Sequence, residues 1–407
     1  MVFLGIDLYV LQGIPALMHV FKLSDKRLVY FVYAFFSILL FSGILLLVFM
    51  GDNLSKTVRT FFLVFISLNF VPKLVFSIFL LIDDLQRGFR WIGGKVYHLF
   101  GPEVSHLPGV PISRSEFLLK TGIVAATIPL VSISYGVFKG AYDYRIKRVK
   151  LPLPNLPAAF EGLKIGQISD IHTGSFYNKT AVKGGVEMLL AEKPDIIFFT
   201  GDLVNQKAVE VKDYIDLFGK VKAPLGVYST LGNHDYGDYV QWPSKEAKRA
   251  NLENLMQVHK IMGWDLLMNE NRIIQQGADK LAIIGVENWG AGARWPKYGR
   301  LDEAVIGTED IPIKLLLSHD PSHWDAQVRP EFKDIDVMFA GHTHGFQFGV
   351  ELGPIKWSPA QYFYKQWAGL YKQDGQMLYV NRGYGFLGFP GRVGMPPEIT
   401  IFELHKT

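Results

Sequence analysis

The 407-residue sequence contains no cysteine. This absence excludes a disulfide framework and any thiolate metal site, so a metal ion would have to take nitrogen and oxygen ligands. Charge is also scarce, because Asp, Glu, Lys and Arg make up 20% of the residues and the formal net charge is only +4. A charge balance this mild gives no reason to expect a nucleic-acid partner.

The first third of the chain is instead rich in long apolar runs. Residues 28–50 include no charged side chain, and residues 121–138 include none either. A weaker run covers 2–21, and a fourth covers 61–82, where Lys73 is the one charged residue. Since about 20 apolar residues suffice to cross a bilayer, we predict an all-α membrane region of about four transmembrane helices in residues 1–140.

The run at 121–138 is preceded by the basic residues Arg114 and Lys120, which gives it the polarity of a signal-type segment. The positive-inside rule does not choose an orientation in the membrane, because the Lys and Arg counts of the loops are nearly equal for both. The polarity of this segment therefore decides the predicted orientation. We predict an uncleaved anchor and place the following domain outside the cytoplasm. Residues 141–160 contain Pro152, Pro154 and Pro157, and we interpret them as a stiff linker to a catalytic domain at 161–407.

The second half of the chain alternates apolar runs with segments of helical period. The helical segments cover 180–192, 209–220 and 245–262. This alternation predicts an α/β domain, in which the loops that follow the strands carry the chemistry. The predicted strands that precede polar motifs are residues 163–169, 196–200, 227–230, 313–318 and 337–340.

The loops after these strands hold side chains of metal-ligand type. Five of the 11 histidines of the chain fall in these loops, which scattered surface histidines would not do. Carboxylate, amide and imidazole groups together suit a first-row divalent cation. In chain order these residues are Asp170, His172, Asp202, Asn233, His234, His319, His342 and His344.

In content and order these motifs resemble the calcineurin-like metallophosphoesterases. The resemblance covers 163–345, and the later run with Asn381, Arg382 and Gly383 is similar to the membrane-associated branch of that family. That branch includes exported cell-envelope phosphoesterases and UDP-2,3-diacylglucosamine hydrolases. The resemblance implies a catalytic domain of two sheets packed face to face and flanked by helices.

The resemblance also implies two divalent ions, for which Mn, Zn or Fe fits the oxygen and nitrogen donors. Asp202 would touch both ions. The first ion would be held by Asp170, His172, Asp202 and His344, and the second by Asp202, Asn233, His319 and His342.

Two ions about 3.5–4 Å apart suit an in-line displacement at phosphorus, because they neutralise charge and lower the pKa of bound water. The expected reaction is hydrolysis of a phosphodiester or pyrophosphate bond by metal-bound hydroxide. His234, beside Asn233, is expected to serve the leaving oxygen as the catalytic acid.

Each motif residue also has a plainer interpretation. His319 alone would suit a turn or a core, Asp202 a helix cap, and Asn233 a left-handed turn. The ordered set favours metal binding over these. The alternative function is a transporter-like membrane protein or a catalytically inactive scaffold with a metal-binding regulatory domain.

The C-terminal part is aromatic, with residues such as Trp357, Tyr362, Phe363 and Tyr364. Residues 384–390, which include Phe386, are predicted to form an exposed loop between glycines. Arg382 and Arg392 flank this loop and are candidate phosphate ligands, and His323 is a further candidate substrate contact. Together with the membrane region, these features predict a phosphorylated, lipid-linked substrate at the bilayer.

Overall fold

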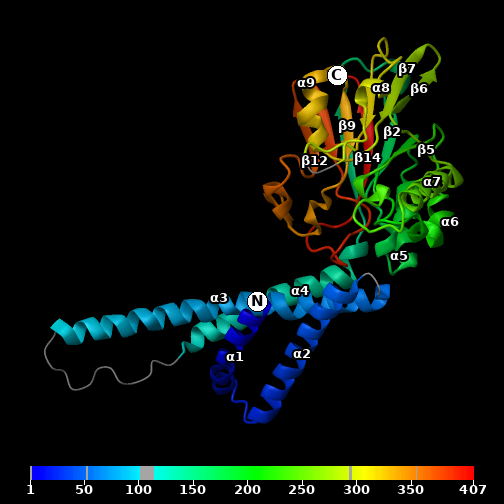
Figure 1. Cartoon of the computed structure of the whole chain (residues 1–407). Helices are drawn as coiled ribbons and strands as arrows, with labels where there is room; N and C mark the ends of the chain where they lie inside the picture. Colours follow the sequence, from blue (N-terminus) through cyan, green and yellow to red (C-terminus); the bar gives the residue numbers. More distant parts are fainter. Residues whose placement is uncertain (1, 52–53, 101–113, 293–295, 354) are drawn as a thin grey trace. The chain divides into compact units, whose positions relative to one another are not determined.

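The structure is a computed structural model that describes residues 2–51, 54–100, 114–292, 296–353 and 355–407. The chain divides into two compact units, Met1–Val137 and Phe138–Thr407 (Figure 1). The first unit is all helical, and the second combines sheets with helices, as the sequence predicts.

Four helices of the first unit are long and apolar enough to cross a membrane, among the residues that the structure describes. They are α1 (Val2–Val20), α2 (Lys26–Met50), α3 (Lys56–Phe100) and α4 (Glu116–Phe138). The protein is therefore an integral membrane protein. Helix α3 runs beyond the predicted span 61–82, because its polar continuation to Phe100 contains no proline that would end a helix. The rest of the expected connector, 101–113, lies outside the described residues.

Charged side chains inside the apolar segments pair with each other. Lys73 Nζ lies 2.6 Å from Asp7 Oδ1. The hydroxyl groups of Tyr33 and Ser37 donate to the same carboxylate oxygen at 3.1 Å and 3.0 Å. Asp7 is thus compensated both in charge and in hydrogen bonds, which is what makes a buried carboxylate tolerable in such a setting.

The second unit contains two six-stranded sheets. The first has the order β1 (Arg145–Pro152), β14 (Glu398–His405), β2 (Lys164–Ile168), β3 (Ile196–Thr200), β4 (Val227–Thr230), β5 (Asp265–Leu266). The second has the order β12 (Gly369–Gln373), β13 (Gln376–Val380), β9 (Val337–Ala340), β8 (Lys314–Leu317), β7 (Asp279–Gly285), β6 (Glu270–Gln276). Strands β2, β3 and β4 are parallel, and so are β7, β8 and β9.

Apolar side chains of both sheets meet in one core. Phe198 of β3 packs on Phe339 of β9 with ring centroids 5.0 Å apart, and Phe339 packs on Phe402 of β14 at 4.9 Å. These contacts join the sheets face to face. The predicted two-sheet α/β sandwich is confirmed.

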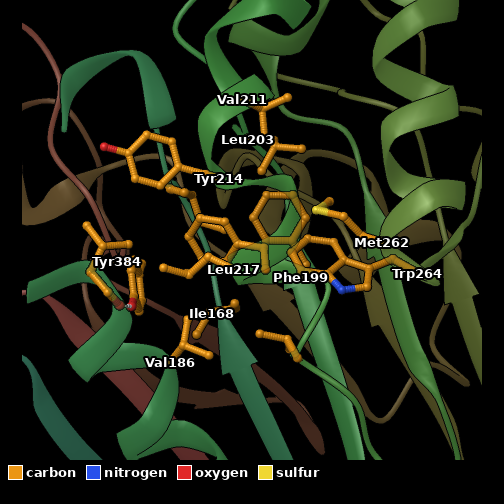
Figure 2. Packing of buried hydrophobic residues seen from close by; sticks show 14 of the residues in the cluster. Ile168, Val186, Phe199, Leu203, Val211, Tyr214, Leu217, Met262, Trp264 and Tyr384 are labelled. Carbon is orange, nitrogen blue, oxygen red and sulfur yellow. Dashed lines mark hydrogen bonds between the residues drawn. The ribbon is translucent and has the colours of Figure 1, made fainter. Parts of the chain in front are cut away.

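Helices cover the outer faces of both sheets. On the first sheet, α5 (Lys179–Ala191), α6 (Ile215–Phe218) and α7 (Lys245–Met262) enclose a second core, in which Phe199 packs on Trp264 at 5.1 Å (Figure 2). Short helices including α8 (Leu301–Ala304) cover a third core on the second sheet. Residues 209–220 differ from the expected single helix, since Ala208–Tyr214 is a 3₁₀ segment.

The segment interpreted as a linker, residues 141–160, belongs instead to the second unit. Its strand β1 pairs with β14 in parallel along Arg145–Pro152, and Leu151, Leu153 and Leu156 are fully buried between the sheets. Proline is compatible with this strand because β1 lies at the sheet edge, where one row of N–H groups has no ladder partner.

Candidate metal centre

The five motifs follow β2, β3 and β4 in one sheet and β8 and β9 in the other. Each set of strands is parallel, so the motifs gather where the carboxyl ends of the two sheets meet. The predicted ligands come together there as two groups.

The first group consists of Asp170, His172 and His344, all buried, with ligand atoms within 4.8 Å of one another. The Nε2 atoms of His172 and His344 are 3.1 Å apart. His344 Nε2 also lies 3.3 Å from Asp170 Oδ1. Three ligand-type atoms thus converge on one point.

The second group consists of Asp202, His319 and His342, again within 4.8 Å. His319 Nε2 lies 3.2 Å from Asp202 Oδ2 and 3.3 Å from His342 Nδ1. The amide oxygen of Asn233 lies 2.8 Å from the same His342 nitrogen, so the fourth predicted ligand is also present.

Asp202 stands between the groups. Its Oδ2 atom is 3.2 Å from His319 Nε2 and 3.4 Å from His172 Nε2, which belong to different groups. A carboxylate in this position is placed to contact two cations at once.

The ligand-type nitrogen and oxygen atoms suit divalent cations. Hydrogen bonds among these atoms cannot pair all of them. Two pairs of imidazole nitrogens face each other, one in each group. A neutral imidazole has one donor and one acceptor, so a nitrogen that faces both another imidazole and a carboxylate cannot satisfy both with one proton. A cation with oxygen and nitrogen preference would accept all these lone pairs.

Hydrogen bonds outside the groups fix which imidazole nitrogen faces inward. His319 Nδ1 lies 2.7 Å from the Thr200 carbonyl oxygen, to which it must donate, so Nε2 presents its lone pair to the site. His342 Nε2 lies 2.8 Å from the Tyr364 hydroxyl, which leaves Nδ1 for the site. The sequence identified Tyr364 only as one of several aromatic residues, because nothing in the sequence places it beside His342.

The electrostatics of the buried carboxylates and imidazoles show strong mutual attraction at the site. Burial lowers the pKa of His172 to about 3, which keeps it neutral. Burial acts against ionisation of Asp170, but the imidazoles of His344 and His319 outweigh it and hold the pKa of its carboxyl well below the usual range. Burial also acts to lower the pKa of His319, yet the carboxylate of Asp202 raises it to about 10. The two buried carboxylates therefore stabilise positive charge at the site, which a proton on His319 supplies without metal and which a bound cation would supply in its place.

The backbone of the ligands is unusual. Five of the seven predicted ligands have positive φ, between 49° and 72°: Asp170, His172, Asp202, His342 and His344. Non-glycine residues rarely adopt this region, and such conformations persist where the surrounding structure enforces them.

Three motif glycines make room for the ligands. Gly201 has φ of +95°, a conformation that glycine adopts without cost. Gly232 and Gly341 do not have positive φ, and their role is steric: a Cβ at Gly232 would lie 2.2 Å from Asp202 Oδ1, and one at Gly341 2.2 Å from Asp170 Oδ2.

His234 and Asp235 occupy different places in the same loop. His234 Nδ1 lies 2.8 Å from the Asn205 carbonyl oxygen, and its ring centroid is 5.2 Å from that of His172. Asp235 is buried and accepts N–H bonds at 2.9 Å from Gly232, Asp202 and Leu203. Asp235 therefore ties the loop after β4 to the loop after β3.

The three candidate substrate contacts are buried among other protein groups, and one of them, Arg392, has its Nη2 atom 3.2 Å from Nδ1 of the predicted ligand His344. Arg392 is 1% exposed, and its guanidinium donates to the carbonyls of Gly385, Met395 and Arg382. Arg382 is 3% exposed and pairs with Glu351 at 2.6 Å. His323 is fully buried between Ser318 and Gln327. Their polar atoms are engaged by the protein itself.

The prediction of an exposed loop at 384–390 is wrong for Phe386. Phe386 is 1% exposed and packs against Tyr142 and Phe176 with centroids 5.8 Å and 6.0 Å away. These aromatic neighbours are distant in sequence, so the glycines around Phe386 gave a misleading signal of exposure.

Two family models match this chain. Residues 1–141 match the model described as "Probable Calcineurin-like phosphoesterase, transmembrane domain", and residues 163–346 match "Calcineurin-like phosphoesterase". Together they account for most of the sequence. The chain belongs to the calcineurin-like metallophosphoesterases, in the group that carries a transmembrane domain, and the family resemblance is confirmed.

Three curated relatives illustrate this membership. A "Transmembrane protein with metallophosphoesterase domain" of Danio rerio is 28% identical over 70% of this chain, which spans 62% of that protein. "Uncharacterized metallophosphoesterase YkuE" of Bacillus subtilis is 28% identical, and the match covers 73% of this chain and 99% of that protein. "UDP-2,3-diacylglucosamine pyrophosphatase LpxG" of Chlamydia trachomatis is 27% identical, and the match covers 64% of this chain and 88% of that protein. The chain thus spans less than two thirds of the Danio rerio relative.

Proposed function

We propose that this protein is a membrane-anchored hydrolase that uses two divalent metal ions to cleave a phosphodiester or pyrophosphate bond. The observation that carries the proposal is the position of Asp202, whose Oδ2 lies within 3.4 Å of imidazoles from both ligand groups. A structural ion would need one closed group of ligands, whereas a shared carboxylate between two groups suits a two-metal reaction at phosphorus.

In this proposal Asp170, His172, Asp202 and His344 hold one ion, and Asp202, Asn233, His319 and His342 hold the other. When bound, the two ions supply Lewis-acid activation of water and neutralise charge on the phosphoryl oxygens. The remaining steps belong to the protein. Thr200 and Tyr364 orient His319 and His342, and Asp235 keeps the two central loops in register.

His234 is proposed as the group that serves the leaving oxygen. Its Nδ1 is engaged by the Asn205 carbonyl, which leaves Nε2 to hold and release the proton. Its backbone N–H donates to Asp202 Oδ1 at 2.9 Å, so the position of His234 is tied to the shared ligand.

We further propose that the substrate is lipid-linked. Four helices anchor the chain in the bilayer. A relative at 27% identity bears the name of a UDP-2,3-diacylglucosamine pyrophosphatase, and an acylated sugar nucleotide is a substrate of that chemical class. The catalytic unit is proposed to lie outside the cytoplasm, as the polarity of residues 114–138 indicates. Alkaline phosphatase fused after Asp143, between α4 and β1, should then be active, and inactivity there would place the unit inside.

The reaction is tested with purified full-length protein, stripped of metal and reloaded with Mn, Zn or Fe. The substrates are an acylated pyrophosphate, a phosphodiester and a phosphomonoester, and mass spectrometry identifies the products. Turnover should require metal and Asp202, and should survive Asp213→Asn, which changes an exposed carboxylate. Stoichiometric metal binding without turnover on any of the three would favour the inactive scaffold.

A further inference from the structure

The clearest feature outside the metal centre is a two-stranded hairpin, β10 (Val350–Leu352) and β11 (Ile355–Trp357). Val350 pairs with Trp357 and Leu352 with Ile355, so these four side chains share one face of the ribbon. That face is open to solvent, since Leu352 is 68% and Ile355 63% exposed.

The opposite face of the hairpin is polar and is fastened to the catalytic unit. Glu351 pairs with Arg382 at 2.6 Å and with Lys147 at 3.4 Å. Lys356 Nζ donates to the Ala368 carbonyl oxygen and lies 4.6 Å from the centre of the Trp367 ring. Arg382 is therefore buried beneath the hairpin by its ion pair with Glu351. These contacts hold the hairpin with its apolar face outward.

Aromatic side chains on either side extend the apolar face. Phe346 packs on Phe363 at 5.2 Å, and Phe348 packs on Trp357 at 6.3 Å. Phe363 and Tyr362 are each 73% exposed. We call the hairpin face and these four flanking rings the apolar patch. Single exposed hydrophobic residues are ordinary, but a contiguous group of this size marks a contact surface.

We propose that the apolar patch inserts into the interfacial region of the lipid bilayer. The same chain carries four membrane-spanning helices, and only residues 139–144 separate α4 from β1, so the catalytic unit is tethered close to a bilayer. The composition suits the interface, because Trp357 and Tyr362 combine apolar rings with polar tips that lie 3.4 Å apart.

The patch also borders a pocket, two of whose lining residues contact the outer side of His342. A pocket of about 740 Å³ is bounded by Phe346 and Phe363 of the patch and by Tyr364 and Asp320. The Tyr364 hydroxyl is 2.8 Å from His342 Nε2, and Asp320 Oδ2 is 3.7 Å from the same atom. If the proposed function holds, this arrangement places the acyl chains of a lipid substrate at the bilayer while its head group enters a pocket beside His342.

The natural sequence has no cysteine, so a single introduced cysteine can be labelled uniquely. Leu352→Cys and Ile306→Cys form a matched pair, because both positions are 68% exposed and only the first lies in the patch. Each full-length variant is labelled with an environment-sensitive fluorophore and reconstituted in phosphatidylcholine–phosphatidylglycerol vesicles, with and without doxyl-labelled lipid. The expected result is strong loss of fluorescence at position 352 and little at 306.

Equal loss of fluorescence at the two positions when doxyl-labelled lipid is added would overturn the proposal. So would efficient energy transfer or oxidative cross-linking between copies at position 352 without lipid quenching, since the patch would then join two copies of the chain. A repeat at Ile355→Cys guards against a local effect of one label. The quenching measurement uses no substrate, so an inactive enzyme can still show quenching at position 352. An active enzyme without quenching would contradict the membrane contact of the patch and leave the proposed function unaffected.

Discussion

Each of the two units buries a group of ionisable side chains. The two groups differ in whether the protein itself supplies all their charge and hydrogen-bond partners. In the membrane unit, one carboxylate, Asp7, faces one ammonium, Lys73, and two hydroxyl donors. In the catalytic unit, Asp170 and Asp202 face four imidazoles, of which two pairs oppose nitrogen to nitrogen. The first group is complete, whereas the second is complete only when cations occupy it.

This difference separates a structural polar cluster from a ligand site without reference to family. A buried ion pair that loses one partner destabilises the fold, because the remaining charge has no compensation. In a metal site, the loss of one ligand first lowers the affinity for the metal ion. The four changes below test the contrast, from the largest expected effect on turnover to the smallest.

Asp202→Ala should abolish activity, with a loss of at least about 10³-fold. The side chain faces both ligand groups, so its removal should release both ions. Metal content is measured by elemental analysis beside turnover of a soluble nitrophenyl diester. Near wild-type metal content and rate would remove the shared role of Asp202.

His234→Ala should retain metal and lose about 10²–10⁴-fold in rate on substrates with poor leaving groups. The loss should shrink on nitrophenyl esters, which need little help from an acid. His405→Ala is the control, since His405 pairs with Glu161 away from the ligand groups. An equal loss on alkyl and nitrophenyl esters would contradict a role in leaving-group protonation.

Gly341→Ala should weaken metal binding about 10–100-fold, the range seen when groups that support ligands are changed. Its Cβ would lie 2.0 Å from Ser169 Oγ and 2.2 Å from Asp170 Oδ2, so the ligand must shift. Gly184→Ala is the matched control, because nothing lies within 4 Å of a Cβ there. Metal titration distinguishes the two, and identical affinities would show that Asp170 relaxes without consequence.

Lys73→Met should have the smallest effect on turnover of a soluble ester and a clear effect on the membrane unit. The change leaves Asp7 buried without its cation, which costs about 3 kcal/mol in such pairs. The double change Asp7→Asn with Lys73→Met should recover most of the lost thermal stability. A double variant no more stable than Lys73→Met alone would show that the pair is not what holds the group together.

Much of the catalytic unit could be predicted from the sequence because its strands end sharply. Predicted strands 196–200, 227–230 and 337–340 coincide with β3, β4 and β9, and each ends at a glycine or a polar motif. Once strand ends are located, the residues that follow parallel strands must meet at one edge. The strand ends thus indicate which side chains lie near one edge, whereas their division between two ions was implied by the family resemblance.

The errors arose where exposure depends on distant partners. Arg382 is buried because Glu351 and Glu398 flank it, and Phe386 because Tyr142 and Phe176 enclose it. Local composition carries no trace of these neighbours. The prolines of 141–160 misled for a related reason, since a linker and an edge strand tolerate proline equally well.

The position of β14 has a consequence for biosynthesis. This strand lies between β1 and β2, although hundreds of residues of chain separate it from them in the order of synthesis. At about 5–20 residues per second, translation from β2 to β14 takes on the order of ten seconds or more. Throughout this interval the helices of the first unit have already emerged, while β1 and β2 each wait with an unpaired edge. Such edges can recruit other strands, so β1 and β2 are open to mispairing until the ribosome delivers residues 398–405.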